Sequence, residues 1–152
     1  MQWKELDIAL STFEKIRSNF PALSMNLDLH HAHVDAAMDI PAQSGLYFDV
    51  HLDFQNGDEL TLSASKCWYE WFPCTNPEKV DRYIEAVSGL LSGEFRLVEH
   101  WRGRRVVMTQ LQRPNGRDWK GVATSFNSSA IIPWPPKTLR IVQNNSSPTH
   151  PA

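Results

Sequence analysis

The stretch Leu-Tyr-Phe-Asp-Val-His-Leu-Asp-Phe, residues 46–54, alternates apolar and polar side chains without a break. Alternation with a period of two is typical of a β-strand that buries one face and exposes the other. Residues 26–40 have the same period, with Ala36, Met38 and Ile40 at even positions. The two stretches therefore predict neighbouring antiparallel strands that share an apolar even face.

The turn at residues 41–45 predicts the register of this pair, with Ile40 opposite Leu46. Small apolar residues of the first strand then lie opposite larger ones of the second, as a packed layer prefers. The same register puts two matched polar pairs on the outer face: Asp35 with His51, and His33 with Asp53.

Histidines and aspartates are the candidate functional side chains of this outer face, and three interpretations stay open. In the first, the residues are ordinary solvated cross-strand pairs; in the second, they form a partner-binding surface; in the third, they form a metal site. The partner-binding candidates are His33, Asp35, Asp49, His51 and Asp53. The metal candidates are His31, His33, Asp35, His51 and Asp53.

Helical periodicity flanks the strand region. Apolar residues at three- and four-residue steps predict a first helix that ends before Pro21 and a second that starts at Thr75 or Asn76 and ends at Gly93. Further strands are expected at residues 60–65, 95–101, 104–112, 117–126 and 137–143. The order α-β-β-β-α-β-β-β predicts an α+β fold, one antiparallel sheet of six or seven strands with two helices on one face.

Charge is segregated along the chain although the net charge is only −2. Residues 18–65 contain seven carboxylates and no lysine or arginine, whereas residues 96–120 are strongly basic. Segregation of this kind produces surfaces of opposite potential on one small body. The basic hairpins also combine cations with aromatic rings, which suits nucleic-acid binding, and the candidates there are Trp101, Arg102, Arg104, Arg105 and Trp119.

No pattern in the sequence identifies an enzyme, a catalytic residue or a cofactor. Cys67 and Cys74 are the only cysteines, and we interpret both as reduced thiols of a cytoplasmic protein. Cys67 falls in phase with the outer face, but no catalytic signature surrounds it. No segment approaches the roughly 20 apolar residues of a membrane span.

The sequence therefore predicts a single domain over residues 1–143, followed by a flexible tail at residues 144–152. The leading functional hypothesis is a non-enzymatic domain that binds a basic protein partner through its acidic face, as immunity proteins and secretion chaperones do. One alternative is a small-molecule or metal-binding enzyme with a pocket by the aromatic cluster at residues 68–72. The other is a nucleic-acid-binding module; the sequence also leaves homodimerisation open.

Overall fold

The computed structural model describes residues 2–127 and 137–144, which contain two helices and nine strands. The first half of the chain holds α1 (Gln2–Asn19), β1 (Asn26–Asp28), β2 (Ala36–Ile40), β3 (Val50–Gln55), β4 (Glu59–Ala64) and β5 (Cys67–Trp71). The second half holds α2 (Pro77–Ser92), β6 (Arg96–Arg102), β7 (Arg105–Asn115), β8 (Asp118–Phe126) and β9 (Lys137–Val142).

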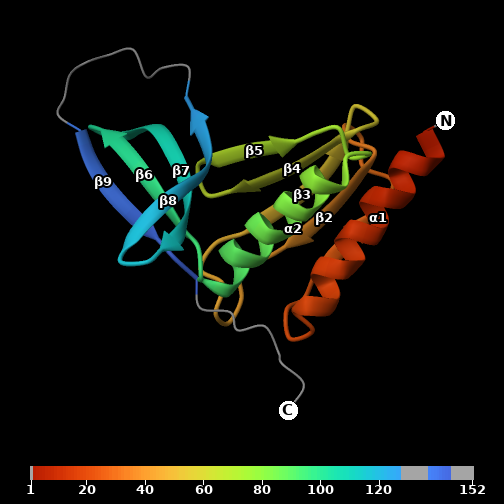
Figure 1. Cartoon of the computed structure of the whole chain (residues 1–152), viewed down its shortest axis with the longest axis horizontal. Coiled ribbons are helices and arrows are strands. Elements are labelled where there is room, and N and C mark those ends of the chain that lie inside the picture. The colour runs from red at the N-terminus through yellow and green to blue at the C-terminus, as the bar shows by residue number, and fades with distance from the viewer. Residues whose placement is uncertain (1, 128–136, 145–152) are drawn as a thin grey trace.

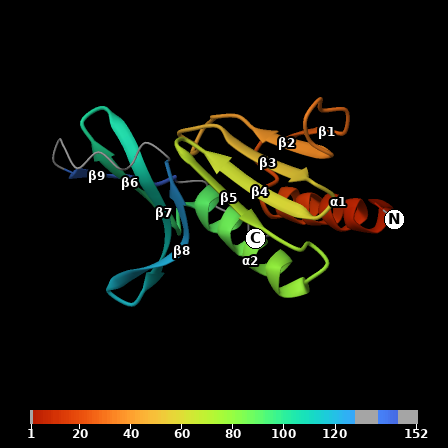
Figure 2. The same ribbon diagram turned by 90° about the horizontal axis from the view of Figure 1, so that it is seen from above.

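The first five strands form one antiparallel sheet in the order β1-β2-β3-β4-β5. Both helices lie against the same face of this sheet (Figures 1 and 2). The apolar stripes of the helices pack there against the even-numbered residues of β2, β3 and β4, which are buried. The α+β class and the two helices on one face are therefore confirmed.

The second half of the chain forms a separate antiparallel sheet in the order β8-β7-β6-β9. The prediction of a single sheet of six or seven strands is wrong, because β5 and β8 lie near each other without pairing. The two sheets still share one core, to which the second sheet contributes Leu97 and Leu111. A buried contact also joins them, since the hydroxyls of Tyr69 and Thr109 lie 2.8 Å apart.

The long strand predicted over residues 26–40 is also wrong, because residues 29–35 form a loop between β1 and β2. Local hydrogen bonds hold this loop: His30 N donates to Asp28 Oδ1, and His33 N donates to His31 Nδ1. Side chains that accept from the backbone two residues away replace the bonds of a strand. The candidates His31, His33 and Asp35 therefore lie in this exposed loop.

The predicted register of the strand pair is displaced by four residues, because Ile40 pairs with Val50 and not with Leu46. Residues 41–49 form a longer connection, in which Ala42 N donates to Asp49 Oδ1 and Gln43 forms a bridge with Leu46. A displacement by an even number leaves each side chain on its predicted face. Val50, Leu52 and Phe54 are accordingly buried.

The strand β5 was not expected, and it changes the position of Cys67. A tight turn at residues 65–66, with Ser65 at a φ of 53°, brings β5 back against β4. Cys67 pairs with Ala64 and is buried beside it, so its predicted place on the outer face is wrong. The turn lacks the Asn-Gly or Asp-Gly pair that marks most hairpins of this length.

The ends of several elements agree with the sequence. Asn76 is the N-cap of α2, where its side chain accepts from Glu78 N, and Gly93 ends the helix in the left-handed conformation. The expected edge strand is present as β9, which pairs with β6. Asn144 is buried and bonds Tyr47 N and Leu90 O, while the rest of the predicted tail lies outside the described residues.

Candidate functional site

Three side chains of β2 and β3 and one of the preceding loop meet on the open face of these strands, opposite the face that the helices cover. Asp39 Oδ1 lies 2.7 Å from His51 Nδ1, because the two residues are direct cross-strand partners. Asp53 follows on the same face of β3, and His31 of the preceding loop lies close enough for its charge to act on it. We call Asp39, His51, Asp53 and His31 the acidic face.

Asp53 occupies the least hydrated position of the acidic face. It lies between Ala37 of β2 and Thr61 of β4, both of which are buried. Partial burial raises the pKa of the Asp53 carboxyl, while the nearby His31 and His51 act in the opposite direction and Asp39 adds to the rise. A positive charge near Asp53 would stabilise its carboxylate and offset the cost of this desolvation.

The structure brings together only some of the predicted partner-binding residues. His51 and Asp53 belong to the acidic face, but their predicted partners Asp35 and His33 do not lie opposite them. Asp35 accepts from Gly57 N at 3.1 Å, and Asp49 accepts from Ala42 N. Asp39 takes the place expected for Asp35, and the sequence missed it only because the register was displaced.

A metal site is not assembled in the residues that the structure describes. Within them, no group of three or more histidine, cysteine, aspartate or glutamate side chains is placed to hold a metal ion. The rings of His31 and His33 lie edge to face with centroids 5.9 Å apart, so these two candidates are neighbours in the loop. Of the other metal candidates, Asp35 accepts from Gly57 N and His51 contacts Asp39. Asp53 lies on the same strand as His51.

The candidate nucleic-acid residues lie on two different hairpins. Trp101, Arg102, Arg104 and Arg105 flank the turn between β6 and β7, whereas Trp119 pairs with Pro114 near the turn between β7 and β8. Arg105 and Pro114 are nine steps apart along one extended strand, which corresponds to about 30 Å. Trp119 also stacks under the guanidinium of Arg96 at 4.2 Å. These residues therefore do not form one surface.

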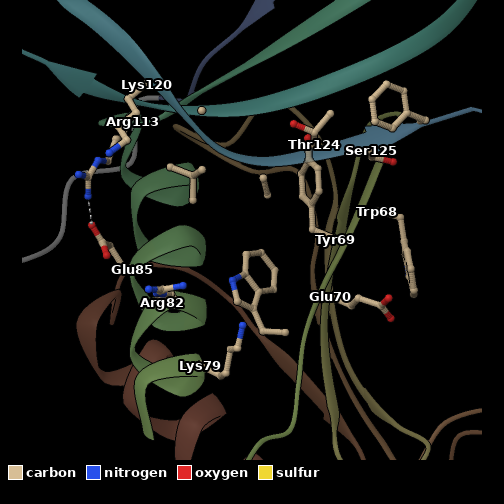
Figure 3. A pocket seen from close by; sticks show the side chains of 15 residues that line it. Trp68, Tyr69, Glu70, Lys79, Arg82, Glu85, Arg113, Lys120, Thr124 and Ser125 are labelled. Carbon is tan, nitrogen blue, oxygen red and sulfur yellow. Dashed lines mark ion pairs between the residues drawn. The ribbon is translucent and has the colours of Figure 1, made fainter. Parts of the chain in front are cut away.

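A groove of about 780 Å³ opens where the two sheets and α2 meet (Figure 3). Its walls are residues 68–71 of β5, the exposed side of α2, and residues 120–126 of β8 together with Arg113 of β7. Because Trp68, Tyr69 and Trp71 line it, the groove lies beside the aromatic cluster where the sequence predicted a pocket. It lies between β5 and the second sheet, a place that only the tertiary structure defines.

Basic side chains follow one wall of the groove. On α2 this wall carries Lys79 and Arg82, followed one turn later by the acidic Glu85. The second sheet adds Arg113 and Lys120 (Figure 3). Arg113 lies 3.5 Å from Glu85. Sequence reasoning missed this wall, although the three-residue spacing along α2 signals a common helix face.

Comparison of the chain with protein-family models, with curated proteins and with solved structures found no match. Neither helix in the described part of the chain is long and apolar enough to cross a membrane.

Proposed function

We propose that the protein is a non-enzymatic binding domain whose acidic face binds a basic protein partner. The observation that supports this function is a pair of carboxylates, Asp39 and Asp53, on a sheet face that the two helices leave open. Residues 18–65 contain no lysine or arginine, so the segment that carries these carboxylates has no lysine or arginine to neutralise them. Immunity proteins and secretion chaperones recognise basic partners by such complementarity, which speeds association and gives specificity.

The chemistry of the two thiols argues against cysteine catalysis. A catalytic cysteine needs an accessible thiol with a pKa near or below neutrality. Burial instead raises the pKa of the Cys67 thiol to about 12, and burial also raises that of Cys74. The nucleic-acid alternative has less support than the acidic face, because its five residues are divided between two hairpins.

The experiment compares partner capture by the wild type and by the isosteric variant Asp39→Asn/Asp53→Asn. A matched control, Asp7→Asn/Asp81→Asn, changes the net charge equally at exposed aspartates on the two helices. We expect proteins of high isoelectric point to be captured by the wild type and the control and lost from the acidic-face variant. Binding of a captured partner should weaken as salt rises from 50 to about 300 mM, because the attraction is electrostatic.

Equal recovery of every partner by all three proteins would refute a role for the acidic face. Circular dichroism of each protein, recorded first, ensures that a loss of capture reports the surface and not unfolding.

A further inference from the structure

Two free strand edges line the groove between α2, β5 and β8. β5 is the last strand of the first sheet and β8 the last strand of the second, so in the described part of the chain each pairs on one side only. Side chains alternate between the two faces of a strand, so a pocket on one face would contact every second residue. Every residue of 120–126 lines the groove, which means that the groove runs along the backbone edge of β8.

The charges of the groove are unequal. Four cations line it, Lys79, Arg82, Arg113 and Lys120, against two carboxylates, Glu70 and Glu85. Arg82 pairs with Glu78 and Arg113 with Glu85. Neither Lys79 nor Lys120 has an ion pair within the described residues. The wall formed by α2 and the second sheet therefore attracts an anion.

Apolar rings border the same groove. Trp68 is 45% exposed and Phe126 72% exposed, although both are large and apolar. Exposed aromatic side chains at the border of a polar groove are typical anchors of a protein–protein contact.

We propose that this groove binds an acidic segment of a partner polypeptide, which extends the second sheet by pairing with the free edge of β8. Backbone hydrogen bonds to residues 120–126 would supply affinity, as in other cases of strand addition. Carboxylates of the segment would face Lys79 and Lys120, and its apolar side chains would contact Trp68 and Phe126. Trp68 and Glu70 lie on the same side of the first sheet as the acidic face, two strands away from it, but the cations of the groove belong to α2, β7 and β8. The groove therefore selects a partner segment of opposite charge, and this proposal does not depend on the proposed function.

The first test uses a fluorescein-labelled octapeptide of alternating glutamate and valine, and fluorescence anisotropy as the readout. We expect Lys79→Glu/Lys120→Glu to weaken binding at least about tenfold, because two attractive contacts become repulsive. The matched control Lys4→Glu/Lys15→Glu changes the same charge on α1, outside the groove, and should leave the dissociation constant within about twofold of the wild type. Equal affinity for a lysine–valine octapeptide, or no binding at millimolar peptide, would overturn the proposal.

The second test separates strand pairing from simple charge attraction. Alternate amides of an added strand face β8, and the others face away. We therefore prepare two peptides of identical charge, one N-methylated at the odd amides and the other at the even amides. Strand addition requires that one of them loses binding and the other retains it. Retention by both would show charge attraction alone and overturn strand addition.

A labelled oligothymidine of eight nucleotides provides the remaining comparison, because basic grooves with aromatic rings also suit single-stranded nucleic acid. We expect it to bind more weakly than the acidic peptide and not to displace it. Tighter oligonucleotide binding that is lost in Lys79→Glu/Lys120→Glu would assign the groove to nucleic acid and overturn the peptide proposal.

Discussion

Burial determines the chemistry of single residues in this protein, most clearly at Cys67 and Cys74. Both thiols are buried, Cys67 beside Tyr69 and Cys74 near the backbone of Glu5. Desolvation disfavours the thiolate, which is the nucleophilic form.

We expect iodoacetamide at pH 8 to modify neither thiol in the native protein, because the pKa of Cys67 is about 12 and that of Cys74 is also raised. In 8 M urea both thiols should react within minutes. Intact mass spectrometry of the two samples checks the prediction. Rapid modification of one cysteine in the native protein would contradict it and would reopen a catalytic role.

Asp53 should make stability depend on pH in a known direction. Its raised pKa means that the folded protein holds the proton more tightly than the unfolded chain does. Its contribution therefore favours folding below the ordinary aspartate pKa of about 3.9 and is lost as pH rises through the folded pKa. Asp53→Asn has no carboxylate to desolvate. At pH 7 the urea concentration at which this variant is half unfolded should therefore equal or exceed that of the wild type.

The measurement is urea unfolding of both proteins between pH 3 and 7, followed by tryptophan fluorescence. Any advantage of Asp53→Asn should shrink toward acid pH. A variant less stable than the wild type at pH 7 would contradict the prediction and would show that the Asp53 carboxylate has a stabilising partner.

At the scale of elements, local hydrogen bonds explain both the agreement and the errors of sequence reasoning. The loop at residues 29–35 interrupts a stretch that alternates like a strand, because Asp28 and His31 accept from nearby backbone. In β7, Val106 and Val107 are both buried although they are consecutive. The ladder with β6 shifts register between His100 and Trp101, which leaves Val107 without a partner on β6 and changes the alternation.

The cap of α2 provides a prediction at this scale, because the sequence allowed either Thr75 or Asn76. Asn76 Oδ1 accepts from Glu78 N at 3.0 Å, so Asn76→Ala should cost about 1 kcal/mol of unfolding free energy. The matched variant Thr75→Ala, one residue earlier and exposed, should change stability by less than about 0.5 kcal/mol. Chemical denaturation measures both values. A larger loss in Thr75→Ala would assign the cap to Thr75.

At the scale of the whole molecule, a few polar contacts join the two sheets in addition to their shared core. Ser65 Oγ donates to Glu99 Oε2 at 3.0 Å, and Asn144 joins the loop before β3 to the end of α2. The hydroxyls of Tyr69 and Thr109 form the buried contact between β5 and β7. Together with the shared core, these contacts join the two sheets whose edge strands β5 and β8 line the groove.

A double-mutant cycle tests the contact between Tyr69 and Thr109. Tyr69→Phe should cost about 1–2 kcal/mol, because it leaves the Thr109 hydroxyl buried without this partner. Tyr69→Phe/Thr109→Val should cost less than the sum of the two single changes, since both polar groups are removed together. Strictly additive losses in unfolding free energy would show that the two hydroxyls do not interact.

The sequence by itself determined the features that depend on near neighbours along the chain. Three- and four-residue spacing identified α1 and α2, and alternation identified the faces of β3 and β4. Asn76 and Gly93 marked the ends of α2. The open polar face was also foreseen, because a displacement of the register by an even number leaves every side chain on its own face.

Only the tertiary structure decided which residues meet across the chain. The partner of His51 is Asp39 and not Asp35, because the connection at residues 41–49 closes through its own hydrogen bonds. The division into two sheets depends on β5, which turns back against β4 and ends the first sheet beside β8. The groove follows from that division, since its cations come from α2, β7 and β8. Local periodicity carries no information about such distant contacts, which are set by the packing of a shared core.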